Sequence, residues 1–156
     1  MTDKPVYLTQ NGKKKLEEEL EYLTTVRRKE VAEAIKSAKE EGDLSENSAY
    51  DEAKLAQGFL EGRVQTIEAQ LRNATIIEST NGHSDKVHIG SVVTVREDGS
   101  DAETYQIVGS AEADPLSGKI SNESPIGQAL LGAKVGQEIV AETPGGDLVL
   151  KVVKVK

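Results

Sequence analysis

Apolar residues recur every three or four positions through the first half of the chain, the pattern of helices that pack along one face. The first stripe consists of Leu16, Leu20, Leu23, Val31, Ile35 and Ala38. It slips by one residue across 27–30, as a coiled-coil stutter does. The second stripe consists of Tyr50, Ala53, Gln57, Leu60, Val64, Ile67, Leu71 and Ala74. Sustained alternation of three and four predicts two long helices in a coiled coil.

Only a few residues separate these two helices, so they are expected to run antiparallel. Each leg is about 45 Å long at 1.5 Å per residue. Thr9 or Asn11 is a candidate cap for the first helix, and Gly42 is expected to end it in the αL conformation. The sequence therefore predicts a narrow finger over residues 1–77, with an acidic tip near 42–47.

After residue 77 the pattern changes to that of strands. A polar linker is expected over 78–84, followed by a second domain over 85–156. The expected strands, which are rich in β-branched residues, are 87–95, 104–108, 135–141 and 148–155. A turn at 143–147 joins the last two strands, and a short helix is expected to start at Pro125. The second half is thus predicted to be a small α+β domain.

Composition narrows the possible functions. The chain has no cysteine, which excludes disulfides, thiolate catalysis and cysteine-ligated zinc. Its net charge is −8, so free nucleic acid would repel it, because phosphate binding depends on cationic neutralisation. Any action on nucleic acid then requires another molecule to hold that substrate. The apolar runs are short and no signal-peptide pattern follows Met1, so we expect a cytoplasmic protein with no role at a membrane.

Two carboxylates, Asp43 and Glu46, fall in the predicted bend, and two interpretations of them stand side by side. In the first they form a capping box, with Asp43 accepting from first-turn amides and Glu46 reaching back, and Ser45 is a rival cap. In the second they offer oxygen ligands to Mg²⁺, which keeps most of its waters and is seldom held by protein alone. An exposed pair would then complete a site that another protein or phosphates partly build, as in two-metal phosphoryl transfer.

The run Glu41–Tyr50 at the predicted tip is the most specific motif of the chain. Further motifs are Leu23–Arg28, Gly58–Arg63, Ile107–Gly109, Ser124–Gly127, Leu131–Gly132 and Thr143–Gly146. In this order and with these gaps, they resemble the bacterial GreA/GreB transcript cleavage factors, most closely the GreA branch. The resemblance covers nearly the whole chain.

This resemblance implies an α+β fold, in which an N-terminal antiparallel coiled-coil hairpin precedes a small FKBP-like antiparallel sheet domain with a short helix. It also implies a monomer that binds RNA polymerase and inserts the finger through the secondary channel. At the active centre the pair matching Asp43 and Glu46 is catalytic, holding Mg²⁺ jointly with the polymerase. The polymerase then hydrolyses the 3′ end of backtracked nascent RNA. By this resemblance the protein lends ligands to another enzyme and is not a nuclease by itself.

Several other residues receive roles from the resemblance, each beside a simpler interpretation. Lys39 and Lys54 would contact the displaced RNA, or they are solvated flank charges. Tyr50 would support the tip, although its place on the apolar stripe favours packing. Ser45 and Asn47 would hold metal-bound water, or they are capping and turn residues. The segment Ser124, Pro125 and Ile126 would dock on the polymerase, or it is simply a helix start.

Three rival functions follow from the same features. An inhibitory paralogue of the family would block the channel, but such tips carry extra acids, whereas Leu44 and Ser45 lie between the two carboxylates here. A coiled-coil adaptor or holdase chaperone would bind clients along the finger and would tolerate loss of the tip charges. Prolyl isomerase activity is rejected, because such pockets need several aromatic residues and this half has only Tyr105.

Overall fold

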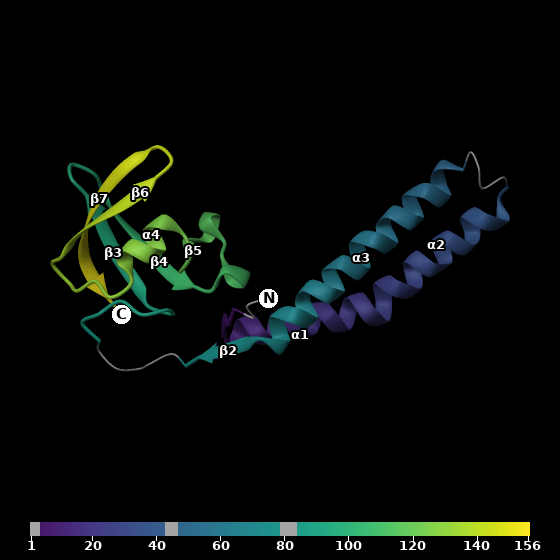
Figure 1. Cartoon of the computed structure of the whole chain (residues 1–156), viewed down its shortest axis with the longest axis horizontal. Helices are drawn as coiled ribbons and strands as arrows, with labels where there is room; N and C mark the ends of the chain where they lie inside the picture. Colours follow the sequence, from purple (N-terminus) through teal and green to yellow (C-terminus); the bar gives the residue numbers. More distant parts are fainter. Residues whose placement is uncertain (1–3, 43–46, 79–83) are drawn as a thin grey trace. The chain divides into compact units, whose positions relative to one another are not determined.

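The computed structural model of this chain describes residues 4–42, 47–78 and 84–156 (Figure 1). It divides into two compact units. One unit, Lys13–Asn73, is a helical hairpin; the other combines the segment that ends at Gly12 with Ala74–Lys156 and contains the sheets. The fold class predicted from the sequence is confirmed, because a long helical hairpin precedes a small curled sheet domain with a short helix. The domain boundaries at 77 and 85 stay a prediction.

The outgoing leg of the hairpin contains one wide turn. α1 (Gln10–Tyr22) and α2 (Arg28–Glu40) are joined by η1, a π-helical segment over Leu23–Arg27. A π turn holds about one residue more than an α turn. It therefore absorbs the one-residue slip that the sequence shows in its apolar stripe. Leu16, Val31 and Ala38, which lie on both sides of η1, are all buried as a result.

Two threonine hydroxyls support this wide turn. Thr24 donates its hydroxyl to the carbonyl oxygen of Leu20 at 2.8 Å. Thr25 does the same to the carbonyl oxygen of Glu21 at 2.6 Å. Such back-bonding occupies main-chain acceptors where the regular helical ladder is disturbed. The π segment is thus stabilised by side chains that belong to it.

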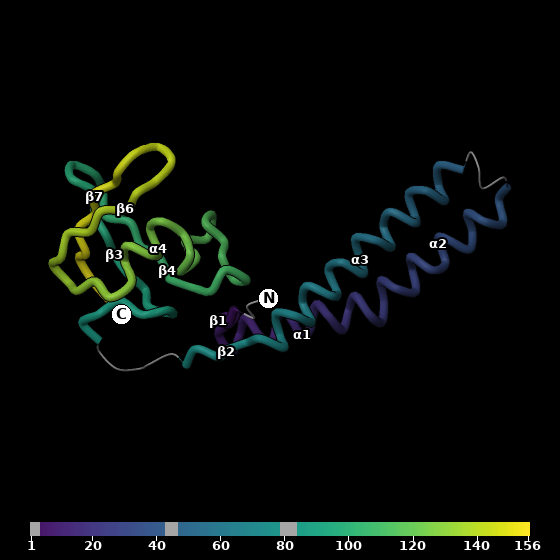
Figure 2. The backbone as a smooth tube through the Cα atoms, in the orientation of Figure 1, coloured from purple at the N-terminus to yellow at the C-terminus, as the bar shows by residue number. Residues whose placement is uncertain are grey.

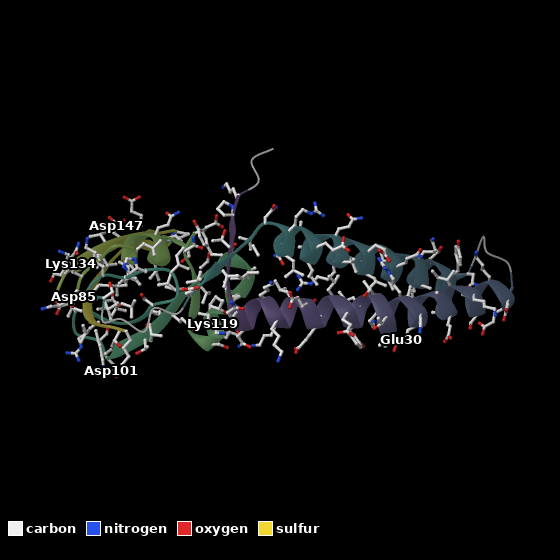
Figure 3. The ribbon with its side chains drawn as sticks, turned by 90° about the horizontal axis from the view of Figure 1, so that it is seen from below. Glu30, Asp85, Asp101, Lys119, Lys134 and Asp147 are labelled. Atoms are coloured by element: carbon white, nitrogen blue, oxygen red, sulfur yellow. The ribbon has the colours of Figure 1, made fainter. Side chains whose placement is uncertain are left out.

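The return leg is a single helix, α3 (Ser48–Arg72), which runs antiparallel to the outgoing leg (Figure 2). Its buried residues are Ala53, Leu60, Val64 and Ile67, all members of the predicted stripe. Val31, Leu60 and Val64 form a buried cluster, against which Leu20, Leu23 and Ile35 pack. The prediction of an apolar seam between two antiparallel helices is confirmed. The stripe ends earlier than expected, because Ala74 begins a strand.

Two bidentate ion pairs link the legs. Arg63 donates to both carboxylate oxygens of Glu19 at 2.7 Å. Arg28 donates to those of Glu61 at 2.9 and 2.8 Å. Two residues apart on a helix is about 200° of rotation, so Glu61 and Arg63 mark opposite sides of α3. We call these sides the Glu19–Arg63 edge and the Arg28–Glu61 edge of the hairpin.

The second unit contains two sheets. In the smaller sheet, β1 (Val6–Thr9) pairs in parallel with β2 (Ala74–Ile77). The larger sheet has five strands in the order β5-β4-β3-β7-β6. They are β3 (Val92–Glu97), β4 (Ala102–Val108), β5 (Lys119–Ser121), β6 (Glu138–Thr143) and β7 (Gly146–Val155). Three of its pairings are antiparallel, whereas β4 and β5 pair in parallel, so the sheet is mixed and not wholly antiparallel as expected.

The core of this unit is aliphatic. Its buried members are Val87, Val93, Val95, Ile107, Ile120, Leu130, Ala133, Ile139, Leu150 and Val152. The short helix α4 (Pro125–Leu130) contributes Leu130, which is fully buried, and lies against β6 and β5. Pro125 is its first residue and Gly132 follows its end with φ of 80°, so the predicted short helix is confirmed.

Glycines shorten two of the expected strands. The strand expected from residue 87 begins at Val92, because Gly90 turns the chain with φ of 97°. The strand expected from residue 135 begins at Glu138, after Gly136 with φ of 86°. Val87 instead exchanges backbone hydrogen bonds with the segment after α4, through Gly132 and Ala133. Its apolar side chain is buried in an irregular segment, which alternation of residues alone does not distinguish from a strand.

A single carboxylate joins the first strand to the larger sheet's connections. Glu112 accepts from the backbone N–H and from the hydroxyl of Thr9, both at 2.7 Å. Thr9 also accepts from the N–H of Gly12 at 2.9 Å, so it is the N-cap of α1, as predicted. A Cβ at Gly12 would lie 2.1 Å from the Glu112 side chain. A side chain at this position would therefore displace the Glu112 carboxylate that bonds to Thr9. Thr9, and not Asn11, is the cap.

Candidate functional site at the tip of the hairpin

The end of α2 defines one side of the hairpin tip. The N–H of Glu41 donates to the carbonyl oxygen of Ser37 at 3.2 Å, which closes the last helical turn. Gly42 follows with φ of 150°. That angle is positive and suits glycine, but it lies outside the αL region that the sequence analysis expected. The helix therefore ends at the predicted place with a different backbone conformation.

Asn47 defines the other side of the tip and connects the two legs. Its side-chain oxygen accepts from the N–H of Tyr50 at 3.2 Å, which makes Asn47 the N-cap of α3. Its side-chain nitrogen donates to the carbonyl oxygen of Ala38, in the last turn of α2, at 2.6 Å. One amide thus satisfies an orphan donor of one helix and an acceptor of the other. The two helix ends are held together by this residue.

Asp43, Ser45 and Glu46 lie outside the described residues. The N-cap of α3 bears directly on the capping interpretation, because a helix that begins at Ser48 has its cap at residue 47. Asn47 makes that cap, so neither Asp43 nor Ser45 is the N-cap of α3. The chain order still places both carboxylates in the short connection between Gly42 and Asn47. Their role as metal ligands stays a prediction.

Both predicted RNA-contact lysines are exposed and lie on the same side of the hairpin. Lys39 follows Arg28 by about three turns, and Lys54 precedes Glu61 by about two turns, so both lie on the Arg28–Glu61 edge. The ammonium group of Lys54 donates to the side-chain oxygen of Gln57 at 2.8 Å. Tyr50 is half-buried, as its place on the apolar stripe indicated. Its backbone N–H supports the tip through the bond to Asn47.

Charge along the hairpin is organised by its ion pairs. The hydrogen bonds from Arg63 hold the pKa of Glu19 below its ordinary value. Arg28 lowers the pKa of Glu61 in the same way. Both hairpin pairs thus remain ionised at neutral pH and keep the two legs linked.

In the sheet unit, a hydrogen bond to the Glu103 carboxylate raises the pKa of Tyr105 to about 12.

The predicted docking segment forms the start of α4. Ser124 is the N-cap, accepting from the N–H of Gly127 at 3.1 Å and donating to the carbonyl oxygen of Ser121 at 2.7 Å. Ile126 is half-buried against the core, whereas Pro125 is exposed. A Cβ at Gly127 would lie 2.0 Å from the carbonyl oxygen of Ser121. Ser124, Ile126 and Gly127 therefore shape this turn, and Pro125 offers the free surface.

Within the described residues, no group of three or more His, Asp or Glu side chains is placed to hold a metal ion. None of the described helices is long and apolar enough to cross a membrane. The described part of the chain therefore holds no complete metal site of its own.

Asn47 was predicted either to hold metal-bound water or to be a capping and turn residue, and its capping role is confirmed. The segment 43–48 offers several residue types that cap helices equally well, so the sequence alone did not single out Asn47. The choice of Asn47 depends on its second bond, to Ala38, which is a tertiary contact. The interhelical pairs were also missed, although an arginine and a glutamate in each leg were the available signal.

Comparison with known proteins extends over both halves of the chain. Residues 6–76 match the family described as "Transcription elongation factor, N-terminal", and residues 82–156 match "Transcription elongation factor, GreA/GreB, C-term". The chain is 58% identical over 150 residues to transcription elongation factor GreA of Bacillus licheniformis, covering 95% of this chain and 94% of that protein. It is 59% identical to the GreA of Bacillus subtilis, with the same coverage.

One solved structure similar to this chain is that of GreA factor homolog 1 of Thermus thermophilus. It is 31% identical, covers 98% of this chain and 99% of its own, and has a TM-score of 0.46. The two family matches and the identities to the Bacillus proteins establish the relationship from sequence. This chain belongs to the GreA/GreB family of bacterial transcription elongation factors.

Proposed function

We propose that this protein binds RNA polymerase, inserts its helical hairpin through the secondary channel and stimulates hydrolysis of the 3′ end of backtracked RNA. The observation that carries this proposal is the construction of the tip. Asn47 fastens the end of α2 to the start of α3, and the connection between them carries Asp43 and Glu46. In this proposal the connection presents these side chains at the far end of two long helices, where they serve a partner and not the protein's own core.

The donor set of the tip suits Mg²⁺. Carboxylate oxygens are its preferred protein ligands, and one or two of them commonly hold it together with phosphates. Asp43 and Glu46 would hold the ion jointly with groups of the polymerase. When bound, the ion supplies a polarised water and stabilises charge on the reacting phosphate. The N-cap of α3 is Asn47, which supports a role for Asp43 other than capping that helix.

The RNA is held by the polymerase in this proposal. A chain of net charge −8 gains little from free nucleic acid. Lys39 and Lys54 nevertheless place two exposed cations on one edge of the hairpin, close to the tip in sequence. There they contact the displaced 3′ segment of the RNA once the polymerase presents it.

The sheet unit docks on the polymerase in this proposal. Its docking surface includes Pro125, which is exposed at the start of α4. The turn around Pro125 is fixed by the two bonds of Ser124 and by the tight fit of Gly127. A preformed surface loses less conformational entropy on binding than a loose loop does. The polymerase is the enzyme, and this protein contributes ligands to its active centre.

The test uses arrested elongation complexes that carry RNA labelled at its 5′ end. Purified protein should shorten the RNA from its 3′ end only when polymerase and Mg²⁺ are both present. Asp43→Asn and Glu46→Gln should each lower the cleavage rate at saturating protein about 100-fold or more, while binding to polymerase is retained. The two variants should also raise the Mg²⁺ concentration needed for half-maximal rate.

Matched controls remove the same charge nearby. Asp51→Asn and Glu40→Gln alter exposed acids that flank the tip, and they should cleave within about twofold of the unmodified protein. Normal cleavage by an Asp43→Asn, Glu46→Gln double variant would refute the metal-ligand role. Inhibition of elongation without cleavage would identify a channel-blocking relative. Binding of unrelated client proteins with no effect on arrested complexes would favour an adaptor or chaperone.

A further inference from the structure

Four large apolar side chains are exposed on the described part of the hairpin. Phe59 is 72% exposed and Leu55 is 61% exposed, both on α3. Tyr22 and Val26, on the outgoing leg, are 50% and 42% exposed. Single exposed hydrophobic residues need no explanation, whereas a contiguous group of them marks an interaction surface. Their arrangement on the hairpin therefore matters.

Tyr22 and Phe59 lie beside the Glu19–Arg63 edge, and Val26 and Leu55 extend from them toward the tip. Leu55 is eight residues from Arg63 and so lies about 80° farther around α3, toward its outer face. Residues three or four apart are neighbours on a helix surface. Tyr22 follows Glu19 by three residues, and Phe59 precedes Arg63 by four. Val26 continues from Tyr22 by four residues, and Leu55 continues from Phe59 by four. Since Glu19 and Arg63 are bonded to each other, the two short rows lie at the same level along the two legs. We call these four residues the apolar ridge.

The ridge leads into a groove between α2 and α3. The groove has a volume of about 480 Å³ and is lined by Ala34, Ser37, Ala38, Glu41, Ala49, Glu52, Ala53 and Ala56. Ala56 precedes Phe59 by three residues, and Glu52 precedes Leu55 by three. The groove therefore lies on the same edge, between the ridge and the tip. Its alanines leave room for an incoming side chain, and Glu41 and Glu52 are its charged residues.

The opposite edge has a different character. It carries the Arg28–Glu61 pair together with Lys39 and Lys54, all exposed or partly exposed. Among the described residues, the exposed large apolar side chains of the hairpin are confined to the ridge. The hairpin is thus two-sided, with an apolar edge and a cationic edge.

We propose that the apolar ridge and the groove beside it form the face that the hairpin lays against the protein wall of the polymerase channel. This inference rests on the proposed function. The occupant is a protein segment with apolar side chains opposite the ridge and a lysine or arginine that enters the groove. Glu41 and Glu52 favour such a cation and repel phosphate, so the occupant is protein and not RNA. Burial of the ridge supplies the apolar contact area.

This assignment orients the finger within its channel. With the apolar edge against protein, the edge that carries Lys39 and Lys54 faces away from the wall, toward the space that the RNA occupies. The rotation of the hairpin about its long axis is then determined by ridge side chains that lie away from the tip. Phe59 and Leu55 are positioning residues in this view, because they touch neither RNA nor metal.

The first experiment maps the two edges by photo-crosslinking in complete elongation complexes. A benzophenone amino acid is placed at Phe59 and, as the matched control, at Gln65, an exposed residue one turn from Glu61 on the cationic edge. The probe at residue 59 should crosslink to a polymerase subunit, at a yield at least about fivefold above that of the probe at residue 65. Crosslinks from residue 59 mainly to RNA, or to a second copy of this chain, would overturn the inference.

The second experiment separates binding from cleavage. A Leu55→Ala, Phe59→Ala variant should raise the protein concentration for half-maximal cleavage about 10-fold or more, with the maximal rate changed less than about twofold. Glu52→Gln should raise that concentration, whereas Glu68→Gln, an exposed acid on the cationic edge, should not. Unchanged half-maximal concentrations for both ridge and groove variants would refute the inference.

The two proposals fail in different ways. Circular dichroism of the variants should match that of the unmodified protein, because the altered side chains lie outside the buried seam. If the unmodified protein stimulates cleavage but residue 59 makes no contact with polymerase, the proposed function stands and the ridge assignment falls. If residue 59 crosslinks to polymerase and no cleavage follows, the ridge assignment stands and the cleavage role falls.

Discussion

Replacing Asn47 tests whether one amide holds the tip together. Asn47→Ala removes the cap on the Tyr50 N–H and the bond to the Ala38 carbonyl oxygen. Loss of an N-cap costs about 1 kcal/mol, and loss of the second hydrogen bond about 1 kcal/mol more. A total of about 2 kcal/mol raises the population of locally opened tips about 30-fold. Asn47→Asp keeps the accepting oxygen but loses the donor, so it should cost about 1 kcal/mol, or about fivefold.

Amide hydrogen exchange followed by NMR measures this opening directly. The Tyr50 N–H lies in the first turn of α3 and is bonded to the Asn47 side chain, so its exchange rate reports the cap. It should rise most in Asn47→Ala and less in Asn47→Asp, with amides near Val64 unchanged. Asn11→Ala, at an exposed residue of α1, is the matched control. If Tyr50 exchanges equally fast in Asn47→Ala and in Asn11→Ala, the amide does not fasten the tip and the reasoning fails.

Three further substitutions test the packing of α4, an open glycine position on α3 and a charge pair of the hairpin. Gly127→Ala forces a Cβ to within 2.0 Å of the Ser121 carbonyl oxygen. It should therefore lower the free energy of unfolding, measured in urea, by about 2 kcal/mol. Gly58 lies in open space on α3, so Gly58→Ala should raise that free energy by about 1 kcal/mol. A Gly127→Ala protein as stable as the unmodified one would contradict this fit. Because Arg63 lowers the pKa of Glu19, their pair stabilises the hairpin above the ordinary carboxyl pKa of about 4.3 and loses that contribution as pH falls through the lowered value. Glu19→Gln should therefore lower the stability of the protein at pH 7, by about 1 kcal/mol or less because the pair is exposed, and should have no effect near pH 2. If thermal unfolding shows the same loss of stability at both pH values, the Glu19–Arg63 pair is not the source of the effect.

The helical hairpin could be predicted because the residues of its buried seam recur at short, regular intervals in the sequence. Leu16, Val31, Leu60 and Val64 follow the spacing that an α-helix imposes, and burial obeys that spacing. Even the slip across 27–30 signalled a real feature, although its form as a π turn four residues earlier depends on backbone hydrogen bonding. The strands were less predictable. β5 has three residues and pairs in parallel with β4, a contact that no local alternation announces.

At the candidate site the sequence supplied residue types, and the structure supplied partners. Asp43 and Glu46 stand out from the sequence because they lie at the break between two helical repeats. The capping role of Asn47 was one of two interpretations offered by the sequence, but its bond to Ala38 was not predicted, because that bond joins segments that become neighbours only after folding. The apolar ridge escaped sequence analysis for a similar reason. Tyr22 and Phe59 belong to different legs, and their common edge is fixed by the pair between Glu19 and Arg63.

The π turn at Leu23–Arg27 has a consequence for how this protein can change in evolution. In an ordinary coiled coil, one inserted residue would rotate everything beyond it by about 100°. Here the extra residue is accommodated in the wider π turn. The hydroxyls of Thr24 and Thr25 donate to main-chain carbonyl oxygens of this region. The outgoing leg thereby contains one extra residue, while the residues beyond the π turn keep their apolar face toward α3. Single-residue insertions in such a hairpin can therefore be accommodated in the middle of a leg without changing the orientation of the tip.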